Sequence, residues 1–165
     1  MSTTHVKGLS ELQKLLDTLP AKLEANVMRG ALRAGAKPIL EEAKRNVPVE
    51  SGTLRDGLKI GTKSRNGTVS ASVKVSGRHA FIAPWIEFGT RAHVITGRDG
   101  GSLFFGGGTF VKSVQHPGAR ARPFLRPALD SQSNAAVVAV GEYIKKRLSS
   151  KHGLDTSEIL IEGDE

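Results

Sequence analysis

The chain contains no cysteine. This absence excludes a disulfide scaffold, a thiolate nucleophile and a cysteine-ligated metal site. Aromatic residues make up only 5% of the 165 residues, and no uncharged apolar run reaches the length of about 18–20 residues that a membrane-spanning helix needs. The first residues, MSTTHVK, have no apolar stretch of the signal-peptide type. We therefore expect a soluble protein whose length favours one domain with a substantial core.

Acidic residues are scarce over most of the chain. The first 154 residues hold all 24 Lys and Arg but only 11 of the 16 Asp and Glu, a net charge of +13. Residues 155–165 hold the other five acids. A basic body with an acidic tail can bind polyanions, or it can meet acidic surfaces of partner proteins. We predict a single domain over residues 1–150 and an acidic C-terminal tail over residues 151–165.

Apolar periodicity predicts three helices, over about residues 10–18, 21–46 and 127–149. Pro38 lies inside the second pattern, where it removes a backbone donor, so we expect a kink near Ala34. Several small residues on the second helix would let another element approach closely: Gly30, Ala31, Ala34 and Gly35.

Strand patterns occupy the middle of the chain. Residues 54–62 and 69–76 flank Asn66-Gly67, the strongest short hairpin signal, and the second of these segments alternates apolar and polar residues. With a third strand over residues 81–90 they make an antiparallel meander. The predicted fold class is α+β, in which a twisted antiparallel sheet of about four strands is packed by a long kinked N-terminal helix and a C-terminal helix.

The stretch FIAPWIEFGT, residues 81–90, holds the only tryptophan. Its apolar residues crowd together without alternating, which is typical of a strand buried on both faces. Pro84 lacks a ladder donor, so the strand should lie at an edge or be bulged there. We interpret Glu87 as a structural residue inside this strand, where it could form a buried pair with an arginine. The predicted structural anchors are Trp85, Glu87, Phe88, Gly89, Pro123 and Phe124.

A glycine-rich segment follows, from Thr90 to Gln115. A loop of this length in a globular domain usually has a function. Its apolar patches allow two readings: a β-hairpin with a flexible tip, or a segment that is disordered until a neighbour pairs with it. After it, Lys112, Arg120, Arg122 and Arg126 form a basic cluster that could contact phosphates or the carboxylates of a partner subunit. A solvated basic segment with a few salt bridges would produce the same pattern.

No motif supports catalysis. His79, Glu87, His93 and His116 match no metal-ligand spacing, and Gly106–Gly108 is followed by no phosphate-loop lysine. No Gly-x-Ser-x-Gly elbow is present. The phenylalanines do not alternate with basic residues, which argues against a base-stacking platform. We predict no catalytic, metal-binding or cofactor-binding residues.

Three groups of motifs occur in a specific order: Val47-Pro48-Val49 with Ser51-Gly52-Thr53-Leu54-Arg55, then Trp85-Ile86-Glu87-Phe88-Gly89-Thr90, then His116-Pro117-Gly118 with Ala121-Arg122-Pro123-Phe124-Leu125-Arg126-Pro127-Ala128-Leu129. The ordered set resembles the tail-completion or head–tail joining proteins of long-tailed bacteriophages, the gene-product-ten-like morphogenesis family. The resemblance covers about residues 8–149. Tyrosine is common in the family where Ile82 or Trp85 stands here, and the acidic tail lies outside the shared pattern.

The resemblance implies a non-enzymatic structural subunit of the virion neck, made in the bacterial cytoplasm, with the same α+β fold. Its partners would be copies of itself in a ring, the tail terminator and the head-side connector or stopper, with weak contact to packaged DNA and none to a membrane. We expect the loop 97–114 and the segment 116–126 to carry subunit contacts. The interface candidates are Leu103, Phe104, Phe105, Phe110, Lys112, His116, Arg120, Arg122 and Arg126. The alternatives are a basic DNA-binding protein and, after it, a metal- or acid/base-dependent enzyme.

Overall fold

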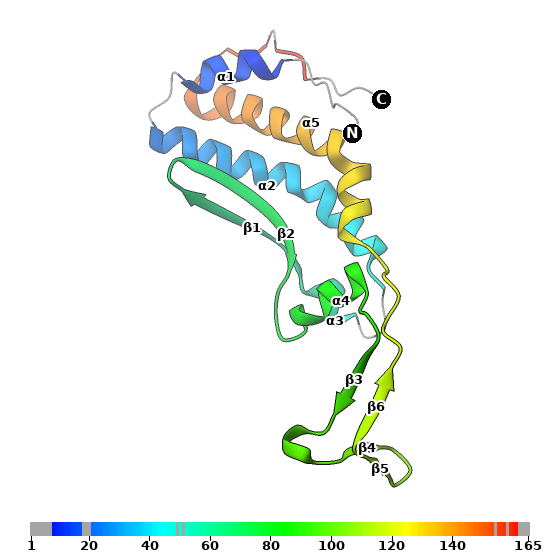
Figure 1. Cartoon of the computed structure of the whole chain (residues 1–165). Helices are drawn as coiled ribbons and strands as arrows, with labels where there is room; N and C mark the ends of the chain where they lie inside the picture. The colour runs from blue at the N-terminus through cyan, green and yellow to red at the C-terminus, as the bar shows by residue number, and fades with distance from the viewer. Residues whose placement is uncertain are drawn as a thin grey trace. The chain divides into compact units, whose positions relative to one another are not determined.

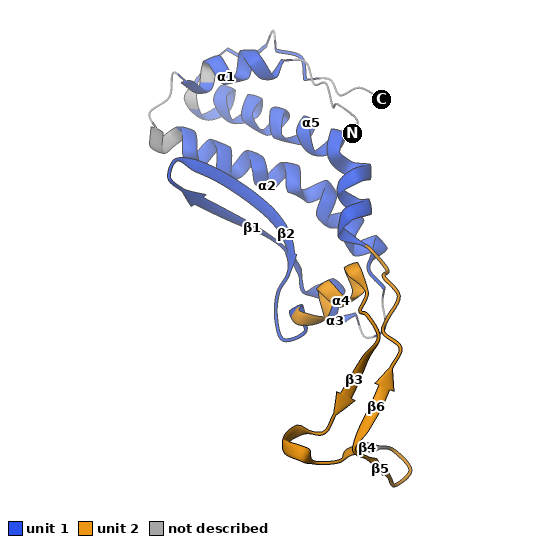
Figure 2. Cartoon of the chain, viewed as in Figure 1, with its two compact units in different colours: residues 1–80, 124–165 blue, residues 81–123 orange. Residues whose placement is uncertain are grey.

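The computed structural model describes residues 8–17, 21–48, 50, 52–153, 155–157 and 159–161. The chain forms two compact units, residues 1–80 with 124–165 (unit 1) and residues 81–123 (unit 2) (Figure 2). The elements of unit 1 are α1 (Leu9–Asp17), α2 (Ala21–Asn46), α3 (Thr53–Asp56), β1 (Leu58–Arg65), β2 (Thr68–Val75) and α5 (Leu125–His152) (Figure 1). The 3-10 turn η1 (Ala80–Ile82) leads into unit 2, which contains α4 (Ala83–Phe88), β3 (His93–Thr96), η2 (Arg98–Gly100), β4 (Leu103–Phe105), β5 (Thr109–Val111) and β6 (Ser113–His116).

The main core of unit 1 lies between helices. The long helices α2 and α5 run side by side, and α1 lies against α5 (Figure 1). The predicted helices are confirmed: the bounds of α2 agree, and the ends of α1 and α5 differ from the prediction by one to three residues. The kink at Pro38 stays a prediction. The buried apolar cluster takes residues from all three helices and from the C-terminal segment: Leu12, Leu16, Val27, Ala31, Ile144, Leu148 and Ile159.

Glycines let α2 and α5 approach closely. A Cβ atom at Gly30 would overlap the phenol ring of Tyr143 on α5. A Cβ atom at Gly35 would stand 2.5 Å from Cγ2 of Val140 and 2.7 Å from the carbonyl oxygen of Ala136. Small residues at these two positions therefore set the helix–helix contact, as the sequence predicted.

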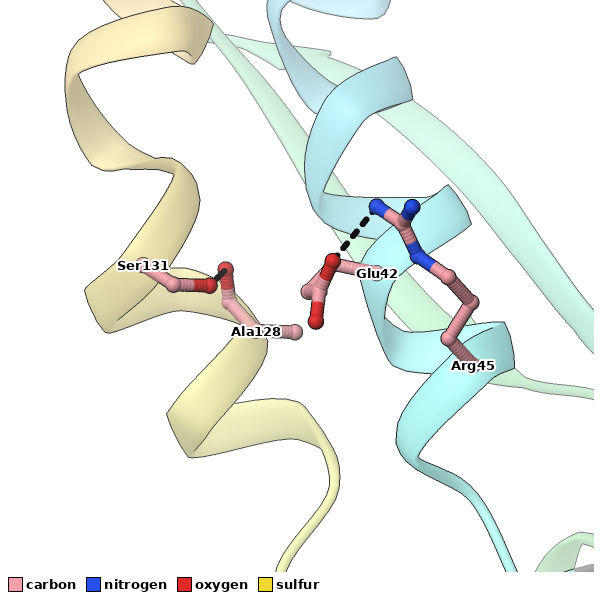
Figure 3. A network of polar contacts seen from close by, with 4 residues as sticks. All are labelled: Glu42, Arg45, Ala128 and Ser131. Atoms are coloured by element: carbon pink, nitrogen blue, oxygen red, sulfur yellow. Dashed lines mark hydrogen bonds and ion pairs between the residues drawn. The ribbon is translucent and has the colours of Figure 1, made fainter.

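Two polar contacts beside this helix pair each remain within one helix (Figure 3). Arg45 donates to Glu42 one turn earlier on α2, at 2.5 Å. Ser131 donates its hydroxyl hydrogen to the carbonyl oxygen of Ala128 on α5, at 3.4 Å. The four residues drawn in Figure 3 thus form no polar link from one helix to the other, and apolar packing carries the contact there.

The β1–β2 hairpin covers α2 in unit 1 (Figure 1). Its strands pair antiparallel from Leu58 with Val75 to Arg65 with Thr68. Asn66 and Gly67 have φ angles of 50° and 77°, the left-handed conformation that a two-residue hairpin turn requires. The hairpin prediction is confirmed, but its first strand begins later than expected, because residues 53–56 form the single helical turn α3.

The strand predicted over residues 81–90 is wrong. These residues form η1 and α4, with Pro84 in the first turn of α4, where its missing N–H costs nothing. An apolar run without alternation does not distinguish a strand from a helix. Without this third strand the meander and the four-stranded sheet do not form. The structure has three two-stranded antiparallel sheets: β1–β2, β3–β6 and β4–β5.

The C-terminal segment returns to the helical core. Gly153, with a φ of 64°, ends α5 and donates its N–H to Leu148. Ile159 is buried in the core cluster, and Ile161 lies where a Cβ atom at Gly141 would stand. Residues 159–161 have no strand assignment. Glu158 and residues 162–165, which carry four of the five acids of the tail, lie outside the described residues.

Candidate assembly interface

Unit 2 consists of α4 and a two-stranded ribbon, residues 90–119, in which β3 pairs with β6 and β4 pairs with β5. The pairing of β3 with β6, which sets His93 opposite His116, continues toward α4 as a bridge between Thr90 and Ala119. Thr90 and Ala119 exchange both backbone hydrogen bonds, at 2.9 and 3.1 Å. Beyond them, the N–H of Arg122 donates to the carbonyl oxygen of Ile86 at 2.7 Å. The two arms of the ribbon are therefore held together along their length.

The far end of the ribbon contains an insertion. The N–H of Gly97 donates to the carbonyl oxygen of Lys112, so the β3–β6 pairing reaches this point. The next paired residues are Leu103 and Val111. On the returning arm, Val111 and Lys112 are consecutive residues. On the outgoing arm, residues 98–102, which include η2, lie between Gly97 and Leu103 and form an insertion. Of the two readings left open for the glycine-rich loop, the structure has the hairpin, with one asymmetric bulge.

Aromatic side chains form an exposed stripe on η1 and α4. Phe81, Trp85 and Phe88 are spaced by four and three residues, so they share one helical face. All three are more than half exposed, and the rings of Phe81 and Trp85 meet edge to face with centroids 5.4 Å apart. Ala83 and Glu87 are buried on the other side of α4. The expected burial is therefore wrong for Trp85 and Phe88 and confirmed for Glu87.

A second aromatic pair lies at the tip of the ribbon. Phe104 of β4 pairs directly with Phe110 of β5, and their ring centroids are 5.2 Å apart. Both rings are more than 60% exposed. Phe105 pairs with Thr109, and its side chain lies outside the described part of the structure. A small exposed hairpin of this kind has little to stabilise it except its cross-strand pair.

Exposed apolar side chains concentrate in unit 2. Nine large hydrophobic residues are exposed among those described, and only Leu129 and Leu160 belong to unit 1. Among the described residues of unit 2, Ala83 is the only buried hydrophobic side chain. The seven exposed side chains of unit 2, between 36% and 70% accessible, are Phe81, Trp85, Phe88, Val94, Ile95, Phe104 and Phe110. A unit with an apolar surface and almost no core of its own is typical of a segment that binds a partner.

The predicted interface residues fall on different parts of the structure. Lys112, Arg120 and Arg122 are exposed in unit 2, on the returning arm of the ribbon, and His116 is half-buried there. Leu103 is half-buried in β4, next to the two phenylalanines. Arg126 belongs to α5 in unit 1. Sequence reasoning missed the exposed face of α4, although the spacing of its three aromatic residues was visible in the sequence.

Two of the histidines considered in the sequence lie together, and the third belongs to the other unit. His93 and His116 are cross-strand partners with ring centroids 5.0 Å apart. Nδ1 of His116 accepts a hydrogen bond from the N–H of Gly118 at 3.0 Å, and Nδ1 of His93 lies 2.9 Å from the carbonyl oxygen of Arg91. His79 lies in unit 1. In the described residues, no three His, Cys, Asp or Glu side chains are placed to hold a metal ion.

Gly89 marks the start of the ribbon. Its φ and ψ angles, 72° and −177°, are those that only glycine adopts readily. A Cβ atom there would stand 2.6 Å from the carbonyl oxygen of Ala119 and 2.8 Å from the nitrogen of Ala121. Pro123 is exposed at the end of unit 2, and Phe124 is fully buried in unit 1. Whether these residues act as structural anchors stays a prediction.

Comparison with known families gives one match. Its model is described as "Bacteriophage HK97-gp10, putative tail-component". Residues 10–89 are HK97-gp10-like. The resemblance inferred from the motifs is confirmed over this range, which contains α1, α2, the β1–β2 hairpin and α4. Comparisons with curated proteins and with solved structures gave no significant match.

The HK97-gp10-like range ends at Gly89, where the ribbon begins. The ribbon and α5 therefore lie outside the family match. The family is one of phage tail components. No helix of the described residues combines the length and the apolar composition that crossing a bilayer requires, because α2 and α5 are long but amphipathic or polar.

Proposed function

We propose that this protein is a structural subunit of a tailed bacteriophage that completes the tail and joins it to the head at the neck. It acts without catalysis, through protein–protein contacts, as a homo-oligomer in the virion. Its neighbours in this proposal are further copies of the same chain, the tail terminator and the head-side connector or stopper. The HK97-gp10-like match supports the phage tail setting.

The distribution of exposed apolar side chains carries the assembly part of the proposal. Seven of the nine exposed large hydrophobic residues lie in unit 2, against a single buried one there. We call the exposed stripe of Phe81, Trp85 and Phe88 the α4 face. Burying one large apolar side chain contributes roughly 1.5–3 kcal/mol, so these three residues would supply a substantial part of the free energy of a subunit contact.

The ribbon also offers backbone groups. Within the β3–β6 sheet each strand has one neighbour, so each leaves an outer edge open to another strand. A subunit that donates its ribbon to one neighbour and receives a ribbon from the other makes heterologous contacts, and such contacts form a ring when the rotation between subunits closes on itself. The occupant that we propose for the α4 face and the ribbon is therefore a second copy of this chain.

The neck role has a direct test. Phage particles produced without this protein should appear in negative-stain images as tailless heads and separate free tails. Complementation with the wild-type chain should restore joined particles. Joined virions in the absence of the protein would contradict the neck role, whatever the state of the isolated chain.

The assembly contacts need a separate test. Exchanging Arg120 and Arg122 for Glu reverses two exposed charges on the ribbon, and it should block assembly while leaving the monomer folded. The same reversal at Arg33 and Lys37 on the exposed side of α2 is the matched control. Circular dichroism reports folding, and complementation titre with particle images reports assembly. Normal assembly of the Arg120/Arg122 variant, or an equal loss in the control, would remove these residues from the interface.

A further inference from the structure

The outward face of the β1–β2 hairpin carries four cations and no acid. Each of its residues is exposed except Gly61, which is half-exposed. The register gives four cross-strand pairs on this face: Lys59 with Lys74, Gly61 with Ser72, Lys63 with Ser70, and Arg65 with Thr68. We call these eight residues the cationic face.

The packing of unit 1 determines which face of the hairpin is outward. Ser64 and Val69, which are cross-strand partners, line one hollow together with Ala25 and Met28 of α2. Leu58, on the same side of its strand as Ser64, is buried. Because successive side chains of a strand point to opposite faces, the cationic face points away from α2.

Among the described residues, no ion pair neutralises the charges of the cationic face. No Asp or Glu occurs between Gly57 and Ile86 in the sequence. In the described residues, the ion pairs join Glu41 to Lys44, Glu42 to Arg45, and Arg55 to Asp56, all outside the hairpin. Lys59 and Lys74 stand directly opposite each other, and like charges in such a pair destabilise a sheet. An anion bound between them would remove this cost.

The side chain of Lys74 lies across the strand. A Cβ atom at Gly61 would be 3.2 Å from Cε and 3.6 Å from Nζ of Lys74, and 3.5 Å from Oγ of Ser72. The ammonium group and the serine hydroxyl therefore gather over a position that has no side chain. An anionic oxygen at this position would meet a cation and a hydroxyl donor together.

From this arrangement we infer that the cationic face binds the phosphate backbone of double-stranded DNA, without regard to base sequence. Phosphates in protein–DNA complexes are contacted by Lys and Arg and by Ser and Thr hydroxyls, which are the side-chain groups that this face presents. Protein–protein interfaces are instead enriched in aromatic residues and depleted in Lys and Ser, and the face has no apolar or aromatic side chain. It also lacks the Asn, Gln or stacking residues that read bases.

The inference goes beyond the neck role and does not depend on it, because the cationic face belongs to unit 1 and the proposed subunit contacts belong to unit 2. It predicts a definite salt dependence. Four phosphate contacts give a slope of about −3.6 in a plot of log affinity against log salt concentration. Affinity should then fall about 150-fold between 50 and 200 mM salt.

The test measures binding of the full chain to a fluorescent duplex of random sequence over this salt range. The hairpin variant exchanges Lys59, Lys63 and Lys74 for Gln. The control variant removes the same charge from exposed positions of α5, by exchanging Lys146, Arg147 and Lys151 for Gln. One remaining phosphate contact should reduce the loss of affinity of the hairpin variant over this range to about 3–4-fold. The control should keep most of the wild-type slope.

Melting temperatures of both variants show that they are folded. The hairpin variant should be at least as stable as the wild type, because the exchange removes the repulsion between Lys59 and Lys74. An unchanged slope in the hairpin variant would overturn the inference, and so would an equal loss in both variants. Competition with polyglutamate distinguishes binding to DNA from binding to acidic protein. If polyglutamate displaces duplex DNA equally well at equal charge, the face binds acidic protein and the inference is wrong.

Discussion

Gly35 of α2 lies against the main chain of Ala136 on α5, with room for a hydrogen but not for a methyl group. The obstacles to a methyl group are Cγ2 of Val140 and the carbonyl oxygen of Ala136, and the carbonyl belongs to a helix backbone and cannot rotate away. A similar close approach occurs at Gly30, but there the obstacle is the end of the Tyr143 side chain. The two glycines of one helix thus differ in what a substitution would displace.

We therefore expect Gly35→Ala to destabilise the protein by about 1–2 kcal/mol, because overpacking outweighs the helix propensity that alanine adds. Gly30→Ala should cost less, because the Tyr143 ring can turn aside. Thermal unfolding followed by circular dichroism measures both, and the first should melt about 3–6 °C below the wild type. A higher melting temperature for Gly35→Ala would show that the helices are further apart.

Substitutions at two neighbouring residues, Ile159 and Leu160, test whether the C-terminal segment packs on the helical core. Ile159 is buried in the core cluster, whereas Leu160 is 64% exposed. Ile159→Ala should cost about 2–4 kcal/mol, and Leu160→Ala should change the free energy of unfolding by less than about 0.5 kcal/mol. Denaturant titration compares the two. Equal effects would mean that the segment does not contribute to the core.

The base of the ribbon depends on Gly89. Gly89→Ala should open the bridge between Thr90 and Ala119, because alanine is strained in this conformation and its Cβ atom would collide with Ala119. Amide hydrogen exchange at Thr90 and Ala119 should become faster. Gly100→Ala is the control, since Gly100 also has a positive φ, 76°, but nothing stands within 4 Å of its added Cβ atom. It should leave exchange at the bridge unchanged.

The single tryptophan reports on the α4 face without labelling. Trp85 is 52% exposed, so its fluorescence in the isolated chain should be strongly quenched by iodide. Assembly should shift the emission to shorter wavelength and reduce quenching, if the face is covered by a second copy. A dilute monomer whose tryptophan resists quenching would show that this face is already covered.

Substitutions at Phe88 and Phe124 should affect assembly and folding stability differently. Phe88 is 70% exposed and Phe124 is fully buried. Phe88→Ala should leave the free energy of unfolding within about 0.5 kcal/mol of the wild type and weaken assembly, whereas Phe124→Ala should cost about 3–5 kcal/mol. Chemical denaturation measures stability, and particle complementation measures assembly. A large loss of stability for Phe88→Ala would place it in the core instead of the interface.

Local signals explain what the sequence predicted correctly. Asn66-Gly67 requires a tight turn whatever surrounds it, and the alternation after it admits only one register, so the hairpin followed from a few residues. The glycines of α2 indicated close packing because a helix interior otherwise disfavours glycine.

The errors arose where the local signal was ambiguous. Residues 81–88 are apolar without a period of two, and Pro84 is acceptable both in an edge strand and in the first turn of a helix. The spacing of Phe81, Trp85 and Phe88 favours the helix, but aromatic residues on one face were expected to be buried. Their exposure depends on which elements pack around α4, and the local spacing of residues does not encode that packing.

Thr90 and Ala119 have a consequence for engineering. They form the kind of doubly hydrogen-bonded pair that a two-residue turn closes. Replacing residues 91–118 by Asn-Gly would therefore join the two arms without stretching either. The shortened chain would keep the HK97-gp10-like residues and the cationic face, and it would lose the whole ribbon beyond the bridge between Thr90 and Ala119. Under the proposed ring assembly, this chain would occupy one side of a growing ring and offer no ribbon to the next subunit, so it should block assembly in cells that also make the intact protein.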